Sequence, residues 1–220
     1  MRVAILGGTG KLGSGLALRW ARSEEVVLGS RQEERAARAA GELNRKLGEG
    51  RIRGASNRRA AEGAELAVLA VPYRSPSGSQ ADILTEVKEA LAGKILISAV
   101  VPVDPGRPGR LLPLGRSAAE EAQEILGPSV RVAAAFQTVA YTHLHDLSRQ
   151  PAGDVLACSD FEDAKAEAIR LAGLCGLRGL DAGPLQNART VEGLTPILIH
   201  LNMRYKVKRA GFRVTGVEGV

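Results

Sequence analysis

The chain has few of the residues that build disulfide frameworks and metal sites. Its 220 residues include two cysteines, Cys158 and Cys175, which are too far apart for a C-x-x-C motif. Each lies in an apolar stretch, which predicts two buried free thiols rather than a disulfide or a pair of metal ligands. His143 and His145 in "THLHD" have no evident third partner, so the sequence predicts no metal site.

Aromatic residues are also scarce, at 3% of the chain, although the formal net charge is +6 and the isoelectric point is about 9.7. A basic balance raises nucleic acid as a partner. However, few rings are present to stack on bases, and no helix-turn-helix or RNA-binding signature occurs. We therefore expect no nucleic-acid partner and interpret the positive charge as serving an anionic small molecule.

Long hydrophobic runs are missing as well. No stretch of about 18 uncharged apolar residues occurs, and Met1 leads directly into a short apolar run with no signal-peptide pattern. Because 45% of the residues are hydrophobic, the chain can nevertheless bury a sizeable core. We expect a globular, cytoplasmic protein that contacts no membrane.

Motifs of side-chain catalysis are absent from the sequence. The chain has no G-x-S-x-G nucleophile elbow and no H-E-x-x-H metal motif. It has no Y-x-x-x-K pair either, because Ser77, His145 and Arg209 stand four residues after its three tyrosines. The sequence therefore predicts no catalytic side chain by motif.

A glycine-rich turn is the most prominent feature that is present. "ILGGTGKLGSGLAL" (residues 5–18) follows a branched apolar run and leads into helical spacing of apolar residues. Gly8, Gly10 and Gly13 fit G-x-G-x-x-G, in which glycine permits a tight turn and close backbone approach to a pyrophosphate. The turn therefore predicts dinucleotide binding, against the alternative of an ordinary glycine-rich turn. The G-x-x-G-x-x-G spacing of short-chain dehydrogenases also fits, so the turn alone does not fix the family.

The end of the second apolar run favours NADP over NAD. About 20 residues past the turn, where an acidic residue would bind the ribose of NAD, the chain has Ser30 and Arg31. A hydroxyl beside a guanidinium suits a 2′-phosphate, and Arg35 follows one helical turn later. Ser30 has an alternative role, because with Glu33 it would form a capping box for a helix that ends at Leu47.

Strand candidates alternate with helical patterns along the chain, which predicts an α/β fold with a Rossmann-type, doubly wound parallel sheet. A capping box at Ser117 and Glu120 begins one of the helices. The expected strands are residues 2–6, 25–29, 66–71, 94–99, 130–135 and 154–158.

Several segments in order resemble the NADPH-dependent coenzyme F420 reductases, also called F420H2:NADP oxidoreductases. They are "ILGGTGKLGSGLALRWA", "VVLGSR", "AVLAVPY", "VVPV", "RSAAEEAQEIL" and "LDAGPLQNARTVEGLTPILI". The match runs over nearly the whole chain, and the last segment is absent from general Rossmann proteins. The resemblance implies reversible hydride transfer between NADP(H) and coenzyme F420, a deazaflavin, in a homodimer.

The resemblance also assigns regions and residues. It implies an NADP-binding Rossmann domain at residues 1–140 and a smaller C-terminal α/β region at 141–220 that closes over the deazaflavin. Thr9, Gly10, Lys11 and Leu12 would bind the pyrophosphate, and Ser30, Arg31 and Arg35 the 2′-phosphate. Tyr73, Val101 and Val103 would line the nicotinamide side, and "AAFQTVAY" would form a wall of the deazaflavin site. Gln137 and Ala140 stand where the family has His and Pro, and glutamine cannot carry charge.

Hydride transfer between two bound cofactors needs mainly alignment in a dry pocket, so a site without a catalytic acid or base is expected. Two other functions stay open. One is an NADPH-dependent reductase of an imine, a ketone or a ferric chelate. The other is a non-catalytic NADP-sensing protein that binds a partner through its basic C-terminal stretch, from Arg204 to Arg213.

Overall fold

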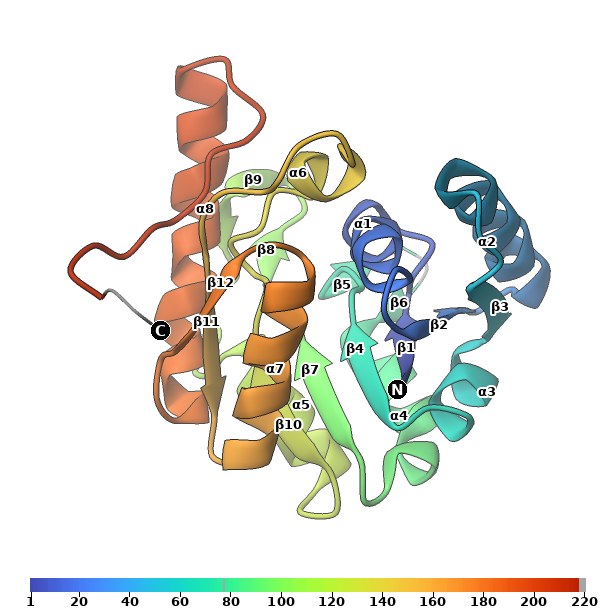
Figure 1. Cartoon of the computed structure of the whole chain (residues 1–220). Coiled ribbons are helices and arrows are strands. Elements are labelled where there is room, and N and C mark those ends of the chain that lie inside the picture. The colour runs from blue at the N-terminus through green and yellow to red at the C-terminus, as the bar shows by residue number, and fades with distance from the viewer. Residues whose placement is uncertain (77, 218–220) are drawn as a thin grey trace.

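The computed structural model describes residues 1–76 and 78–217 and contains one eight-stranded sheet with helices on both faces (Figure 1). Its central strands are apolar and buried along their whole length, as in sheets covered on both sides. In chain order the strands are β1 (Arg2–Leu6), β2 (Glu25–Ser30), β3 (Ile52–Ser56), β4 (Leu66–Leu69), β7 (Ile95–Ser98), β10 (Arg131–Ala134), β11 (Asp154–Ser159) and β12 (Arg178–Asp181).

The spatial order of the strands is β12-β11-β10-β7-β4-β1-β2-β3. The six strands from β10 to β3 are parallel, which confirms the predicted Rossmann-type sheet, while β11 runs antiparallel to β10. The order reverses between β1 and β4, whose connections leave in opposite directions. Ligands of open α/β sheets bind at such a point, outside the carboxyl ends of the strands.

Two buried clusters fill the space on either side of the sheet. The first includes residues of α1 (Lys11–Trp20), α2 (Glu33–Leu47) and α7 (Glu162–Leu174). The second includes residues of α3 (Asn57–Glu62), α4 (Gln80–Val87), α5 (Ala118–Leu126) and α8 (Ala188–Arg204). The short helix α6 (Tyr141–His145) lies beside α1, and α8 extends beyond the sheet (Figure 1). The described residues also include two 3-10 turns, Glu89–Leu91 and Leu185–Asn187.

Two small hairpins stand at the carboxyl edge of the sheet. One is formed by β5 (Arg74–Ser75) and β6 (Gly78–Ser79), and the other by β8 (Val103–Asp104) and β9 (Arg107–Leu111). They belong to the two long loops after β4 and β7. Both loops leave the carboxyl ends of their strands, the edge of the sheet at which ligands bind.

A buried arginine fastens the segment after β10 to α1. The guanidinium group of Arg19 donates hydrogen bonds of 2.6 to 3.1 Å to four backbone carbonyl oxygens, of residues 143, 144, 146 and 149. Burial lowers the pKa of this side chain. Because four acceptors converge on one group, α6 and the segment that follows it are held against α1.

The six predicted strands are confirmed, and so is the capping box of Ser117 and Glu120. The predicted capping box of Ser30 and Glu33 is wrong. Ser30 is the last residue of β2, paired with Ser56 of β3, so α2 begins after Gln32 instead. Strands β3 and β12 were not predicted, because "IRGAS" and "RGLD" have too few apolar residues to indicate a strand by themselves.

Residues after 140 extend the same sheet through β11 and β12 and cover it with α7 and α8. The division into regions 1–140 and 141–220 stays a prediction. Cys158 and Cys175 are buried free thiols, as predicted, and burial raises their pKa values to about 11 and 12. Within residues 1–76 and 78–217, none of the helices combines the length and apolar character needed to cross a membrane.

Candidate cofactor-binding site

The glycine-rich turn joins β1 to α1 at the switch point. Gly7 has a φ of +72°, and a Cβ atom on it would lie 2.2 Å from Val71 Cγ1. A Cβ atom on Gly13 would lie 2.8 Å from Gly8 Cα. These contacts leave no room for side chains, so the turn brings the backbone of the helix start directly onto the strand.

The start of α1 is suited to an anion. Its N-cap is Gly10, which supplies no side-chain cap, and the first turn contains no acidic residue. The amide groups of a helix start lack helical partners and carry the positive end of the dipole. Thr9 and Gly10 line the adjoining cavity, so this end of the helix faces the space where a phosphate group would bind.

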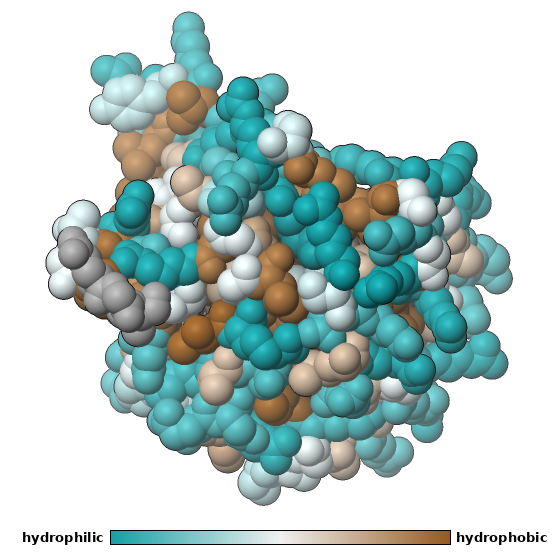
Figure 2. Space-filling model, in the orientation of Figure 1, coloured by the Kyte–Doolittle hydropathy of each residue, from teal (hydrophilic) through white to brown (hydrophobic). Residues whose placement is uncertain are grey.

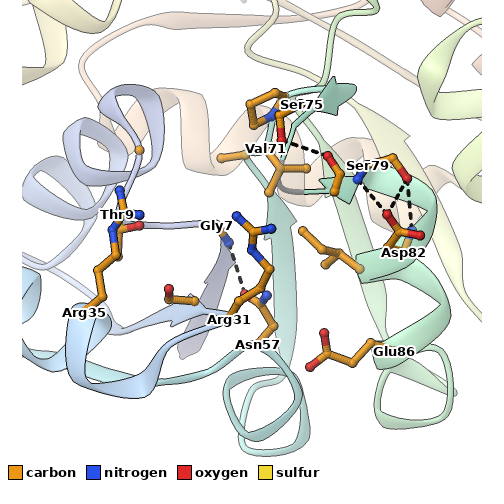
Figure 3. A pocket seen from close by; sticks show the side chains of 16 residues that line it. Gly7, Thr9, Arg31, Arg35, Asn57, Val71, Ser75, Ser79, Asp82 and Glu86 are labelled. Atoms are coloured by element: carbon orange, nitrogen blue, oxygen red, sulfur yellow. Dashed lines mark hydrogen bonds between the residues drawn. The ribbon is translucent and has the colours of Figure 1, made fainter.

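The first cavity has a volume of about 550 Å³ and is formed by the ends of β1, β2, β3 and β4 (Figure 3). Figure 3 shows Thr9 and Arg35 on one side of it and Ser79, Asp82 and Glu86 on the other, with Arg31 and Asn57 between them. Its lining residues are Gly7, Thr9, Gly10, Ser30, Arg31, Arg35, Asn57, Ala70, Val71, Pro72, Ser75, Gly78, Ser79, Asp82, Ile83 and Glu86.

The three residues expected at a 2′-phosphate lie together at this cavity. Ser30, Arg31 and Arg35 all line it, and Ser30 Oγ accepts a hydrogen bond of 3.2 Å from the backbone N–H of Gln32. The hydroxyl proton of Ser30 can still be donated to an anion. Arg31 lies next to the β5–β6 hairpin: a Cβ atom on Gly78 would be 3.4 Å from Nη1 of Arg31. Two guanidinium groups and a hydroxyl thus line the same cavity.

Asn57 is a cavity residue that the sequence analysis did not identify. Its side chain is 1% exposed, and its Oδ1 atom accepts a hydrogen bond of 3.2 Å from the N–H of Gly7. The Nδ2 atom is buried without a protein partner, in a residue that lines the cavity. A Cβ atom on Gly29 would lie 2.7 Å from Oδ1, so this bond needs glycine at the end of β2. An unpaired buried amide is costly, so this donor is available to a ligand group in the cavity.

The opposite wall of the first cavity contains carboxylates. Asp82 closes a capping box at the start of α4, where its Oδ2 atom accepts from the N–H (2.8 Å) and the hydroxyl (2.9 Å) of Ser79. Hydrogen bonds from the backbone and then the side chain of Ser79 lower the pKa of Asp82. Glu86 lies one turn further along α4. This wall carries negative charge, whereas Arg31 and Arg35 bring positive charge to the same cavity.

A second cavity, of about 230 Å³, lies on the other side of the α1 start. It combines one residue of α1, the segment after β10, one face of α8 and two residues of the basic C-terminal stretch. Apolar side chains dominate its walls. The lining residues are Leu12, Phe136, Gln137, Thr138, Val139, Ala140, Tyr141, Thr195, Leu198, Ile199, Asn202, Lys208 and Ala210.

Gln137 has a defined orientation at the second cavity. Its Nε2 atom donates a hydrogen bond of 3.0 Å to the carbonyl oxygen of Ser98, while its Oε1 atom is buried without a protein partner. Because a carbonyl can only accept, Nε2 and not Oε1 must face Ser98. The preceding residue, Phe136, has a φ of +73°, and its ring packs edge-on against Trp20 at 5.5 Å between centroids. Such strained backbone in a buried residue is typical of functional sites.

The structure separates three further predicted residues from both cavities. Tyr73 is 4% exposed, and its hydroxyl donates to Glu121 Oε2 at 2.5 Å, so its ring lies in the core and not in a cavity wall. Burial, then the bond to Glu121, raises its pKa. Val101 and Val103 lie at the β8–β9 hairpin, and neither lines the two cavities. Their contact with a nicotinamide stays a prediction.

Gly8 and Gly13 belong to the packing between strand and helix, and they line neither cavity. Lys11 points its ammonium group toward the ring of Tyr141, at 5.1 Å from the centroid. In the sequence, Lys11 stands between Gly10, which lines the first cavity, and Leu12, which lines the second. In the part of the chain that the structure describes, no three His, Cys, Asp or Glu residues gather closely enough to hold a metal ion.

Comparison with known proteins gives consistent relatives. Residues 2–102 match the family model described as "NADP oxidoreductase coenzyme F420-dependent". The F420-dependent NADP reductase of Methanothermobacter marburgensis is 42% identical over 226 residues, 99% of each chain. That of Methanocaldococcus jannaschii is 40% identical over 227 residues, which cover 99% of this chain and 100% of the relative. The crystal structure of a proposed F420-dependent NADP reductase from Arthrobacter sp. FB24 superposes with a TM-score of 0.81 at 28% identity, covering 98% of this chain and 99% of that one.

Proposed function

The chain belongs to the family of coenzyme F420-dependent NADP oxidoreductases, and from this premise we propose that it transfers a hydride reversibly between NADP(H) and coenzyme F420. The observation that carries the proposal is the pair of adjoining cavities. Gly10 lines one and Leu12 lines the other, so the start of α1 contributes to both. Two cofactors bound side by side fit this arrangement.

We assign NADP(H) to the first cavity. Its volume of about 550 Å³ lies within the range of small-molecule sites. The uncapped start of α1 would bind the pyrophosphate through Thr9, Gly10, Lys11 and Leu12, with Gly8 and Gly13 allowing the approach. Ser30, Arg31 and Arg35 would bind the 2′-phosphate.

We assign the deazaflavin ring to the second cavity, where residues 136–141 and α8 form the walls. Apolar walls with a few polar groups are typical of small-molecule and cofactor sites. The unpaired Gln137 Oε1 would accept a hydrogen bond from an N–H or O–H group of the ring. Lys208 at the rim, with nearby Arg204 and Lys206, would attract the anionic tail of coenzyme F420. On this view region 141–220 covers the deazaflavin.

The side chains act by placement rather than by acid–base chemistry. When bound, the two cofactors supply the hydride donor and acceptor carbons, and the hydride carries its electron pair from one to the other. The chain holds the two rings in register and excludes water with apolar walls, which supplies several kcal/mol through effective molarity. A site without a protein acid or base is consistent with this role.

We further infer a homodimer in the cytoplasm. Large apolar side chains are exposed along and after α8: Ile197, Met203, Tyr205 and Val207. Figure 2 shows hydrophobic atoms on the part of α8 that projects from the body. A second copy of the chain would cover them, because a dimer about a twofold axis buries the same patch of both subunits. Light scattering coupled to gel filtration tests this, and a monomer at micromolar concentration would contradict it.

The function is tested by mixing the purified protein anaerobically with NADPH and oxidised coenzyme F420 and following both absorbance bands. We expect a coupled loss of both bands, and a much slower reaction with NADH in place of NADPH. Binding of NADPH without turnover would overturn the proposed reaction. The alternative reductases would then be tested with imines, ketones and ferric chelates.

A further inference from the structure

A buried carboxylate on α8 completes the start of α5. Glu192 is 1% exposed, and its two oxygens accept hydrogen bonds from the backbone N–H groups of Ala118 (2.9 Å) and Ala119 (3.2 Å). These are the first two residues of α5, whose amides have no partner within their own helix. Burial raises the pKa of Glu192 to about 7, despite the two N–H donors, which lower it.

The same helix reaches the second cavity one turn after Glu192. Thr195 Oγ1 donates a hydrogen bond of 2.9 Å to the carbonyl oxygen of Gln137. Directly after Thr195, Pro196 has no N–H to donate to the carbonyl oxygen of Glu192, so one helical bond is missing at this turn. The later residues Leu198, Ile199 and Asn202 then form the cavity wall. The position of that wall therefore depends on how firmly the turn at Glu192 is held from outside the helix.

The start of α5 is also joined to the first cavity. Gln80, the first residue of α4, donates through Nε2 to the carbonyl oxygen of Ala118 at 3.0 Å, and its N–H donates to the carbonyl oxygen of Tyr73 at 3.0 Å. Helix α4 carries Asp82 and Ile83 of the first cavity wall. The two cavities are thus built against one support, and Glu192 connects that support to α8.

We propose that Glu192 is a positioning residue for the reaction: by fastening α8 to α5 it sets the wall of the second cavity against which the ring of coenzyme F420 lies. The inference rests on the proposed function. Both carboxylate oxygens accept in the ionised form, whereas protonation converts one of them into a hydroxyl, which accepts poorly from Ala119. The wall is therefore held most firmly when Glu192 is ionised.

The other ionisable groups around Glu192 either form hydrogen bonds with other side chains or stay neutral. On α5, Glu120 pairs with Arg189 of α8 through bonds of 2.6 and 2.7 Å, and Glu121 accepts from the hydroxyl of Tyr73. Both carboxylates contribute to the raised pKa of Glu192. On β11, the pKa of Cys158 is raised to about 11, so this thiol stays neutral. Glu192 is therefore the group in this cluster that titrates near neutral pH.

The test compares wild type with Glu192→Gln, whose amide can accept from one N–H only. We expect kcat/KM for coenzyme F420 to fall about tenfold above pH 8, where the wild-type carboxylate is ionised, with the Kd of NADPH changed less than about twofold. The ratio of wild type to variant should shrink toward one near pH 6. Titration of the cofactors themselves affects both proteins and cancels in this ratio. Glu124→Gln, an exposed carboxylate on α5, is the matched control and should show no effect.

A ratio that stays constant between about pH 6 and pH 8, or NADPH and coenzyme F420 binding that weaken equally, would overturn the inference. If circular dichroism shows that Glu192→Gln does not fold, Thr195→Val provides the test instead. We expect this variant to raise the KM for coenzyme F420 with NADPH binding kept, and an unchanged KM would count against the inference. Failure of the proposed function is distinct, because the wild type would then show no turnover at any pH.

Discussion

The backbones of Gly8 and Gly13 touch across the junction of β1 and α1, so that a Cβ atom on Gly13 would lie 2.8 Å from Gly8 Cα. This contact brings the uncapped start of α1 to the edge of the first cavity. Neither glycine lines the cavity, yet both determine where the helix start lies. Their contribution to cofactor binding is therefore made through the backbone.

Gly13→Ala should separate the helix from the strand, because the clash is with backbone atoms that cannot turn away. We expect a loss of about 1–3 kcal/mol in the free energy of unfolding and weaker NADPH binding. Urea unfolding and fluorescence titration measure the two effects. Gly41→Ala in α2 is the control, since a Cβ atom there meets nothing within 4 Å, and we expect it to stabilise the protein by about 0.5–1 kcal/mol. Equal behaviour of the two variants would contradict the contact.

Arg31→Ala should distinguish the two nicotinamide cofactors. The guanidinium lines the first cavity beside Ser30, and we expect its loss to weaken NADPH binding about 10- to 100-fold and NADH binding less than about threefold. Arg38→Ala removes an exposed arginine of α2, the helix that begins shortly after Arg31, and controls for the change in net charge. Equal losses for both cofactors would refute the phosphate role of Arg31.

Asn57→Asp keeps the acceptor for Gly7 N–H but removes the unpaired Nδ2 donor and adds a negative charge at the nucleotide cavity. We expect NADPH affinity to fall about tenfold and the melting temperature to fall as well, because the new carboxylate is buried. Calorimetric titration and thermal unfolding provide the two readouts. Undiminished NADPH affinity would show that no ligand group accepts from Asn57.

Acid should unfold the protein in part through Glu120. Hydrogen bonds from Arg189, and next those from Ser117, lower its pKa to about 2 against the opposing effect of burial. A lowered pKa means that the stabilisation is complete above the unfolded-state value of about 4.5 and is lost as pH falls toward 2. Glu120→Gln should therefore flatten the decline of stability with falling pH in this window. The urea midpoint as a function of pH measures it, and an unchanged slope would refute the assignment.

Glu192 should have the opposite effect on stability. Its pKa is raised to about 7, so between about pH 4.5 and 7 the folded state holds a proton that the unfolded state has lost. This contribution to stability declines as pH rises through that window, and Glu192→Gln should remove the decline. The same series of urea midpoints tests it. A variant that keeps the wild-type slope would show that Glu192 is ionised throughout.

The local elements were predictable because their signals are local. Apolar runs between helical patterns indicated six strands, and the glycine pattern indicated the strand–turn–helix unit. The resemblance of segments in order indicated the family. The start of α2 was mispredicted because Ser30 has two possible local roles, and its pairing with Ser56 of β3 excludes the cap.

The sequence by itself determined the order of the elements, the glycine-rich turn and the arginines that follow β2. The tertiary structure alone decided which distant groups meet. Asn57 reaches Gly7 across 50 positions, and Glu192 reaches Ala118 across 74. It also turned Tyr73 into the core and left one amide atom of Asn57 and one of Gln137 unpaired. Such contacts depend on how the strands are ordered in space and on which polar groups the fold buries, and no local pattern encodes either.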